Sequence, residues 1–327
     1  MKVLITGITG MVGSHMAEYI LQNHPSAEIY GLVRWRSPLE NIRGILPRII
    51  LHQAELRDLN SLVFMLRKVK PDWIFHLAAQ SYVTASFDAP VDTIHTNVIG
   101  TTNLLDALRI TGIDSKVHIC SSSEVYGQVT QDEIPIRETN PFRPASPYAV
   151  SKVGEDMIAF QYFLSYGIRT VRTRMFTHTG PRRGDVFAES AFAKQIAEIE
   201  AGIRQNPVKV GNLDSVRTFA DVRDAVKAYW LMMERCPPGE VYNIGGNETM
   251  TVGEMLGILK GMARCPIEHK VDSKLLRPSD VTLQIPDTSK FQDATGWCPE
   301  ISVEKTLEDL LDYHRKQIRE ENSEAIK

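Results

Sequence analysis

A tyrosine and a lysine, Tyr148 and Lys152, stand four positions apart in the segment "SPYAVSK". If this segment is helical, the two side chains share one face and lie one turn apart, so the phenol and the ammonium point together. A phenol ionises at about pH 10, and a neighbouring positive charge lowers that pKa. The pair therefore predicts a tyrosine that acts as a general base near neutral pH, unless it is a chance pair on a helix surface.

A carboxylate follows three hydroxyls in the segment "CSSSEVYG", Cys120 to Gly127, directly after a run typical of a buried strand. A lone carboxylate at the end of a core strand costs desolvation energy unless it is paired or used. Glu124 is therefore a candidate proton-transfer group, with the hydroxyls of Ser122 and Ser123 beside it. An N-cap or a loop carboxylate with an ion-pair partner is the structural alternative.

Three glycines, Gly7, Gly10 and Gly13, follow the first predicted strand and open the first predicted helix. A glycine turn between a strand and a helix lets the pyrophosphate of a dinucleotide approach the N–H groups at the helix start. The alternative is a tight turn with close helix packing. The position of the turn, inside a strand–helix–strand unit at the beginning of the chain, favours a dinucleotide site.

Two cationic side chains and a hydroxyl, Arg34, Arg36 and Ser37, follow the second predicted strand. NAD-specific sites usually place an acidic residue here, which binds the ribose 2′-hydroxyl. Arg34 with Arg36 or Ser37 suits a 2′-phosphate instead, so we expect NADP as the cofactor, with NAD as the alternative. The competing interpretation is a solvated loop, in which arginines are common.

Short apolar runs alternate with helical patterns over the first half of the chain, and these elements would position the groups above. The predicted strands cover residues 2–6, 28–33, 49–52, 73–77, 117–120 and 170–175, and the predicted helices cover residues 12–22, 59–69, 91–111 and 147–166. Such alternation is typical of a parallel sheet with helices on both faces. We predict an α/β fold with a Rossmann-type doubly wound parallel sheet in residues 1–175. Residues 176–327 are predicted to form a smaller C-terminal mixed α/β substrate domain, with parts interleaved with the first.

A formal net charge of −3 over 327 residues gives no long-range attraction for nucleic acid or an anionic membrane. No apolar run approaches the roughly 20 residues that a membrane helix needs. The four cysteines lack metal-ligand spacing, and the first strand begins at Lys2, which leaves no room for a signal peptide. We therefore expect a cytoplasmic protein that acts on a small molecule, without nucleic-acid, membrane or metal partners.

The glycine turn, Ser122, Tyr148 and Lys152 together resemble the extended short-chain dehydrogenase/reductase superfamily, whose members mostly modify nucleotide-linked sugars. The resemblance covers essentially the whole chain. Within the superfamily, the chain resembles the GDP-mannose 4,6-dehydratases, with the GDP-4-keto-6-deoxy-D-mannose reductases as close relatives. The strings that carry this resemblance are "GITGMVGSHMAEYIL", "HLAAQSYVTASFDAP", "SSSEVYG", "PASPYAVSK", "GPRRGDVF", "VGNLDSVRTFADVRDAVKAYWLM" and "LRPSDV".

The resemblance implies conversion of GDP-D-mannose to GDP-4-keto-6-deoxy-D-mannose with no net consumption of the cofactor. It implies that Tyr148 and Ser122 remove the proton of the sugar C4 hydroxyl while hydride passes from C4 to NADP⁺. Glu124 then takes the C5 proton and helps to expel the C6 hydroxyl as water, and the hydride returns to C6. A GDP-4-keto-6-deoxy-D-mannose 4-reductase, a nucleotide-sugar 4-epimerase and a non-catalytic dinucleotide sensor remain alternatives.

The resemblance also implies sets of functional residues and an assembly. The catalytic set is Ser122, Glu124, Tyr148 and Lys152. The cofactor set is Gly7, Thr9, Gly10, Met11, Val12, Gly13, Arg34, Arg36, Ser37, Glu55, Leu56, Leu77, Ala78, Ala79, Gln80, Tyr148 and Lys152. The substrate set is Ser81, Ser122, Ser123, Glu124, Tyr148, Thr177, Arg183, Lys194, Arg217, Arg277 and Asp280, in which Thr177 replaces the asparagine of the family. Relatives form dimers or tetramers, so we expect a homodimer or homotetramer.

Overall fold

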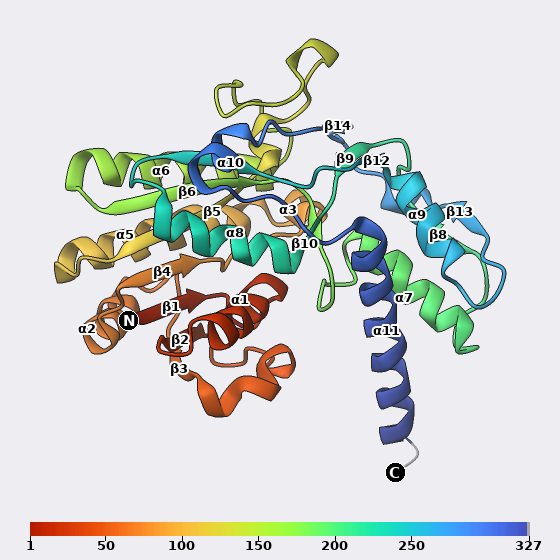
Figure 1. Cartoon of the computed structure of the whole chain (residues 1–327), viewed down its shortest axis with the longest axis horizontal. Helices are drawn as coiled ribbons and strands as arrows, with labels where there is room; N and C mark the ends of the chain where they lie inside the picture. Colours follow the sequence, from red (N-terminus) through yellow and green to blue (C-terminus); the bar gives the residue numbers. More distant parts are fainter. Residues whose placement is uncertain (326–327) are drawn as a thin grey trace.

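The computed structural model describes residues 1–325, and its centre is a sheet of seven parallel strands (Figure 1). The strand order is β11-β6-β5-β4-β1-β2-β3. The strands are β1 (Lys2–Thr6), β2 (Glu28–Val33), β3 (Ile50–Gln53), β4 (Trp73–His76), β5 (Lys116–Ser122), β6 (Arg169–Met175) and β11 (Val241–Ile244). The order reverses between β1 and β4, which opens a crevice at the carboxyl ends of the strands. The predicted Rossmann-type doubly wound sheet is confirmed.

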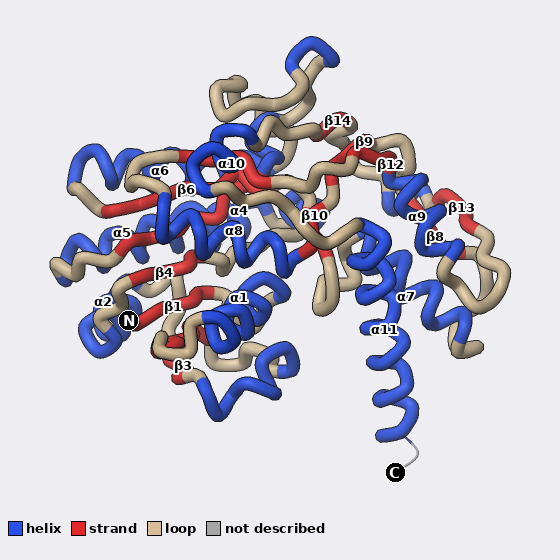
Figure 2. The backbone as a smooth tube through the Cα atoms, viewed as in Figure 1, coloured by secondary structure: helices blue, strands red, loops and turns tan. Residues whose placement is uncertain are grey.

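Helices cover both faces of this sheet (Figure 2). One face packs against α1 (Met11–Asn23), α8 (Val222–Arg235) and the 3₁₀ segment η1 (Glu40–Arg48). The other face packs against α2 (Leu59–Val69), α5 (Gly100–Thr111) and α6 (Pro147–Tyr166). Because side chains alternate along a strand, Val3 and Ile5 of β1 enter the first core whereas Leu4 enters the second.

The segment predicted as one helix over residues 91–111 is continuous but contains a change of helical type. It consists of α4 (Pro90–Ile94), a π-helical turn η2 (His95–Ile99) and α5. The sequence pattern also missed α3 (Val83–Asp88) and η1, because both are too short or too irregular to show a helical repeat.

The C-terminal part is a mixed arrangement of short strands and helices with its own apolar core. Its helices are α7 (Ala188–Glu200), α9 (Val252–Gly261), α10 (Ser289–Thr295) and α11 (Val303–Ala325). Its short strands are β7 (His178–Thr179), β8 (Val208–Val210), β9 (Val216–Thr218), β10 (Ala220–Asp221), β12 (Thr249–Thr251), β13 (His269–Val271) and β14 (Leu283–Gln284). Besides η1, the 3₁₀ turns are η3 (Ser123–Tyr126) and η4 (Gln131–Glu133), which lie before residue 176, and η5 (Ser273–Leu275) in the C-terminal part. In Figure 1, α7, α9 and α11 lie to the right of the sheet.

The two halves of the sequence are interleaved in space. Strand β11 pairs in parallel with β6, and α8 packs on the sheet face that also holds α1. Residues from the second half therefore complete both the central sheet and the helix layer on one of its faces. The domain boundary between residues 175 and 176 stays a prediction. Among residues 1–325, no helix is both long enough and apolar enough to cross a membrane.

Candidate active site

A cavity of about 770 Å³ lies at the carboxyl ends of the central strands. Its wall combines the glycine turn after β1, the loops after β2, β4 and β5, the start of α6, and residues of the C-terminal part. Most members of the predicted site sets line it. The exceptions are Arg36, Lys194 and Asp280.

The glycine turn brings the backbone of three segments into close contact. Gly7 has a φ of +71°, and a Cβ atom there would lie 2.8 Å from the nitrogen of Ala78. A Cβ atom on Gly13 would overlap the carbonyl group of Gly7. Gly10 is the N-cap of α1 and contributes no side-chain acceptor, so the first N–H groups of the helix are left for the cavity. This turn has the geometry of a phosphate cradle.

The loop after β2 places Arg34 and Ser37 in the cavity wall. The Ser37 Oγ accepts a hydrogen bond from the backbone N–H of Arg34 at 2.9 Å, which fixes the shape of the turn. Arg36 is exposed and lies outside the lining. The sequence analysis missed Asn41, whose Nδ2 donates to the carbonyl of Thr9 at 2.9 Å and so holds the glycine turn.

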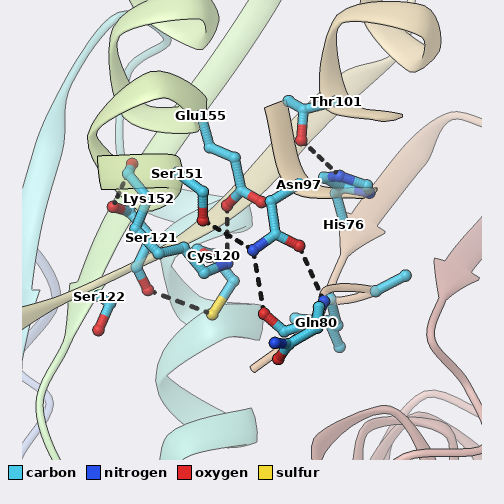
Figure 3. Close-up of polar contacts among 12 residues, drawn as sticks. His76, Gln80, Asn97, Thr101, Cys120, Ser121, Ser122, Ser151, Lys152 and Glu155 are labelled. Carbon is cyan, nitrogen blue, oxygen red and sulfur yellow. Dashed lines mark hydrogen bonds and ion pairs between the residues drawn. The ribbon is translucent and has the colours of Figure 1, made fainter. Parts of the chain in front are cut away.

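The loop after β4 is held by hydrogen bonds with side chains of β1 and of the π-helical turn η2. The backbone N–H groups of Leu77 and Ala78 both donate to Thr6 Oγ1 at 3.1 Å. Asn97 Oδ1 accepts from the N–H of Gln80 at 2.8 Å, and its Nδ2 donates to the Gln80 carbonyl and to Ser151 Oγ at 3.0 and 2.8 Å (Figure 3). The π-helical turn carries Asn97, which therefore ties the β4 loop to α6. Such turns often occur at functional sites.

Helix α6 presents Tyr148 and Lys152 to the cavity. The helix starts at a Ser146 N-cap, whose side chain accepts from the N–H of Ala149, and proline occupies the first helical position. Lys152 Nζ lies 5.9 Å from the centre of the Tyr148 ring and donates to the Cys120 carbonyl at 2.9 Å. The predicted convergence of phenol and ammonium is present.

The electrostatics of this pair favour a charged lysine. Burial raises the pKa of Tyr148 above that of a free phenol. The Lys152 ammonium and a hydrogen bond with Ser122 act to lower this pKa but do not outweigh burial, so the lowered pKa expected from the sequence is not found. For Lys152, burial acts to lower the pKa, but the charges of Glu155 and of an ionised Tyr148 outweigh it and raise the pKa. Lys152 therefore stays an ammonium at neutral pH and supports ionisation of the phenol.

At the end of β5, the two serine hydroxyls form hydrogen bonds within the protein, whereas the glutamate carboxylate does not. Ser122 caps the turn η3, because its Oγ accepts from the N–H of Glu124 at 3.2 Å. Ser123 Oγ donates to Gln284 Oε1 at 2.6 Å. The Glu124 side chain is half-buried in the cavity wall, and its carboxylate has no hydrogen-bond or ion-pair partner in the part of the chain that the structure describes. Neither structural alternative for Glu124 is found there.

The C-terminal part contributes cations to the opposite wall. The Arg183 guanidinium stacks on the Phe187 ring at 3.5 Å, and burial lowers its pKa. Arg217 donates to the Val281 carbonyl at 2.8 Å. The buried Arg183 Nε and Arg217 Nη1 have no partner within residues 1–325. These donors suit an anionic ligand.

Of the remaining predicted substrate residues, two lie outside the cavity lining and one lines it. Asp280 is outside the lining but sits 3.9 Å from Arg217 and 3.7 Å from Arg277, both of which line the cavity. Lys194 is held by Asp185 at 2.6 Å and is outside the lining. Thr177 lines the cavity at the end of β6.

The two histidines near the site are held by protein groups. His76 bridges the hydroxyls of Thr6 and Thr101, and His178 contacts the Phe176 carbonyl. Burial lowers the pKa of His76 to about 3 and that of His178 to about 4, so both are neutral at pH 7. No group of three or more potential ligands is placed to hold a metal ion within the described residues.

Comparison with known families gives a match over most of the chain. Residues 4–310 match the family model described as GDP-mannose 4,6 dehydratase. The chain belongs to this family. The resemblance inferred from the sequence motifs is therefore confirmed.

Two curated relatives carry different activities. The chain is 33% identical to the GDP-mannose 4,6-dehydratase of Yersinia enterocolitica, with 95% of this chain and 92% of the relative covered. It is 31% identical to the GDP-6-deoxy-D-mannose reductase of Pseudomonas aeruginosa, with 98% and 99% covered. A solved structure of RMD from Pseudomonas aeruginosa complexed with NADPH superposes with a TM-score of 0.84 at 30% identity, covering 97% of this chain and 99% of that one.

Proposed function

We propose that this protein is a nucleotide-sugar 4,6-dehydratase that converts GDP-D-mannose to GDP-4-keto-6-deoxy-D-mannose. The observation that carries this proposal is the position of Glu124. Its carboxylate lines the same cavity as Tyr148 and Lys152 and has no partner within residues 1–325. Elimination of water needs a side chain that can accept and donate a proton, and a carboxyl group without a partner is suited to this role.

The glycine turn fits a dinucleotide. Gly7 and Gly13 have no room for a Cβ atom, and the start of α1 offers its N–H groups to the cavity. A nicotinamide dinucleotide bound there would supply a reversible hydride acceptor. Arg34 in the wall favours NADP over NAD, because a guanidinium binds a 2′-phosphate whereas an acidic residue would repel it.

The proton transfers can be assigned to named side chains. Tyr148, supported by the Lys152 charge and by Ser122, takes the proton of the C4 hydroxyl. The C4 ketone makes the C5 hydrogen acidic, and Glu124 takes that proton. The protonated Glu124 then gives its proton to the departing C6 hydroxyl, which leaves as water. When a hydride returns to C6, C5 must regain a proton, and the proton that Tyr148 took from the C4 hydroxyl balances it, so no proton is gained or lost overall.

The arginines of the opposite wall fit the diphosphate of a GDP-sugar. Arg183, Arg217 and Arg277 line this side of the cavity, and forked guanidinium donors match phosphate oxygens. Asp280 lies 3.9 Å from Arg217 and 3.7 Å from Arg277, so its charge attracts both guanidinium groups. Because these arginines lie on the wall opposite Tyr148 and Glu124, a diphosphate bound to them would place the sugar on the side of those two residues.

A reductase is the second candidate, and one observation favours it. The reductase relative matches 98% of this chain and 99% of its own length, so this chain resembles it in length as well as in sequence. A reductase would use the same Tyr148 and Lys152 to deliver a proton to a C4 ketone. It would have no use for a proton-transfer group at Glu124.

Incubation with GDP-D-mannose distinguishes the two activities. The dehydratase is expected to form a 4-keto-6-deoxy product, identified by mass spectrometry and NMR, with no stoichiometric change in nicotinamide absorbance. A reductase would leave GDP-D-mannose unchanged and would consume one reduced cofactor for each molecule of GDP-4-keto-6-deoxy-D-mannose. That second pattern would overturn the proposal.

We also propose a homodimer formed through α6. The exposed apolar side chains Val150, Met157 and Leu164 are spaced seven residues apart and form one stripe along this helix. Met157→Lys is expected to convert dimers to monomers in sedimentation velocity. Ile203→Lys, at an exposed apolar residue outside α6, is the control and should not change the assembly. A monomeric wild-type protein would contradict the proposal.

A further inference from the structure

Glu155 is a buried carboxyl that lies behind the cavity and outside its lining. It follows Lys152 by one turn of α6, and its Oε2 accepts a hydrogen bond from Lys152 Nζ at 2.7 Å (Figure 3). The side chains of Lys152 and Glu155 are 6% and 2% exposed. The second carboxyl oxygen, Oε1, has no hydrogen-bond partner within residues 1–325.

Stability does not account for this arrangement. Desolvation of two buried charges offsets most of their attraction, so a well-packed apolar pair is often as stable or more stable. The unpartnered Oε1 adds a further desolvation cost. If this position served packing alone, an apolar side chain would therefore give a folded state at least as stable as the carboxyl group does.

Geometry connects Glu155 to the reacting groups through Lys152. An ammonium has three N–H donors. Glu155 Oε2 takes one of them and the Cys120 carbonyl takes another at 2.9 Å. Because these two acceptors fix the ammonium, the direction of the third N–H is also fixed. That donor is the one left for Tyr148 or for a ligand in the cavity.

Charge connects the same groups. The Lys152 ammonium lowers the pKa of Tyr148, and the Glu155 carboxylate raises it. Burial raises the pKa of Glu155 to about 7. The Lys152–Glu155 pair therefore has a net charge of zero when Glu155 is ionised and of +1 when Glu155 is protonated, and the phenol is more acidic in the second state.

The buried titratable groups closest to Lys152 and Glu155 keep their charge near pH 7. His76 and His118 are neutral because burial lowers the pKa of each to about 3, and burial raises the pKa of Cys120 and of Tyr229. On β6, the cations Arg172 and Arg174 both pair with Asp156. The other acidic or basic groups on elements packed against α6 lie toward solvent or in the cavity wall, namely Asp88, Asp92, His95, Asp106, Arg109, Glu124 and Arg169, except for Lys116, which is buried and donates to the carbonyls of Met233 and Cys236.

We propose that Glu155 is a positioning residue, which orients the Lys152 ammonium and adjusts through its own charge how strongly that ammonium promotes ionisation of Tyr148. The identity of the reaction rests on the proposed function, but the coupling between Glu155 and Lys152 does not. Glu155 touches no part of the cavity and acts only through Lys152.

The pH profile of kcat/KM tests the effect on the reacting groups. Glu155→Gln keeps an oxygen that can accept from Lys152 but removes the negative charge. The pKa values of Tyr148 and Lys152 should both fall, so both limbs of the profile should move to lower pH, the acidic limb by about one unit, as expected for one charge at an effective dielectric constant of about 20. Glu155→Asp retains the charge and should keep the limbs near their wild-type positions.

The matched control is Glu200→Gln, because Glu200 also forms a shielded ion pair, with Arg315 at 2.7 Å, but lies outside the cavity lining. It should leave the pH profile unchanged. A Glu155→Gln profile that coincides with the wild type, or moves to higher pH, would overturn the proposal. A loss of activity without movement of the limbs would show a structural role only and would overturn it too.

A direct titration separates failure of this inference from failure of the proposed function. In protein with ¹³C-labelled glutamate carboxyls, the resonance absent from Glu155→Gln should titrate near neutral pH, and Lys152→Met should raise its midpoint further. This result needs no substrate and no turnover. A Glu155 resonance with an ordinary glutamate pKa that Lys152→Met does not move would refute the coupling, whatever the enzyme converts.

Discussion

At the scale of single residues, the proposed role of Glu124 is the one that differs between a dehydratase and an oxidoreductase. Glu124→Gln keeps the size of the side chain but removes its ability to exchange a proton. Oxidation at C4 should still occur, whereas elimination should slow by about 10²- to 10⁴-fold, the usual contribution of a general acid–base group. Reduced cofactor should therefore accumulate on the enzyme, which absorbance spectroscopy after mixing with GDP-D-mannose would detect.

The control for this prediction is Glu133→Gln, since Glu133 pairs with Arg143 and does not line the cavity. It should convert GDP-D-mannose at the wild-type rate. If Glu124→Gln also forms product at that rate, Glu124 has no part in the reaction.

Arg34 and Arg36 test cofactor choice with the same change of charge at two neighbouring positions. Arg34→Asp should weaken NADP binding relative to NAD by at least about tenfold, because a carboxylate repels the 2′-phosphate but accepts a bond from a 2′-hydroxyl. Arg36→Asp should have a smaller effect, since Arg36 lies outside the lining. Calorimetric titration with both cofactors measures the ratio, and an equal ratio in the wild type and Arg34→Asp would mean that Arg34 does not bind the phosphate.

At the scale of elements, the contact between the β1 turn and α1 depends on Gly13. Gly13→Ala should displace the turn, since its Cβ would overlap the Gly7 carbonyl, and we expect a loss of about 1–3 kcal/mol in the free energy of unfolding. Cofactor affinity should fall as well. Both can be measured, by denaturant unfolding and by calorimetry.

Gly257 in α9 offers the matching substitution, because a Cβ there would meet no atom within 4 Å. Gly257→Ala should stabilise the protein by about 0.5–1 kcal/mol, the helix preference of alanine over glycine, without any change in cofactor binding. Equal effects of the two substitutions would contradict the close-contact account of the turn.

At the scale of the whole molecule, the nucleotide-binding layer needs residues from both halves of the chain. A fragment of residues 1–175 would lack β11 and α8, and with them the buried side chains Tyr229 and Trp230 that pack in the first core. The exposed sheet edge and apolar face should prevent stable folding or cause aggregation. Circular dichroism melting of this fragment beside the full chain checks the prediction, and a cooperative melt at the full-chain temperature would refute it.

Much of the fold and site is encoded in local patterns. The bounds of β1, β2, α2 and α6 agree with the predicted ranges, because each has a clear apolar repeat and ends at polar or glycine residues. The Tyr148–Lys152 pair follows from helix geometry alone, and the glycine turn follows from its place between a strand and a helix. For these features the relevant contacts join residues a few positions apart, so the sequence was sufficient.

Other features depend on contacts between distant segments, and only the tertiary structure decided them. Three features depend on which segments meet in space: the link from Asn97 to Gln80 and Ser151, the packing of α8 and β11 on the first half, and the absence of a partner for the Glu124 carboxylate among residues 1–325. Glu155 stands at a helical spacing from Lys152 that many surface pairs share; burial by the surrounding elements makes this pair different. The sequence states which groups are available, but the free energy of a charge depends on how much water the rest of the fold removes from it.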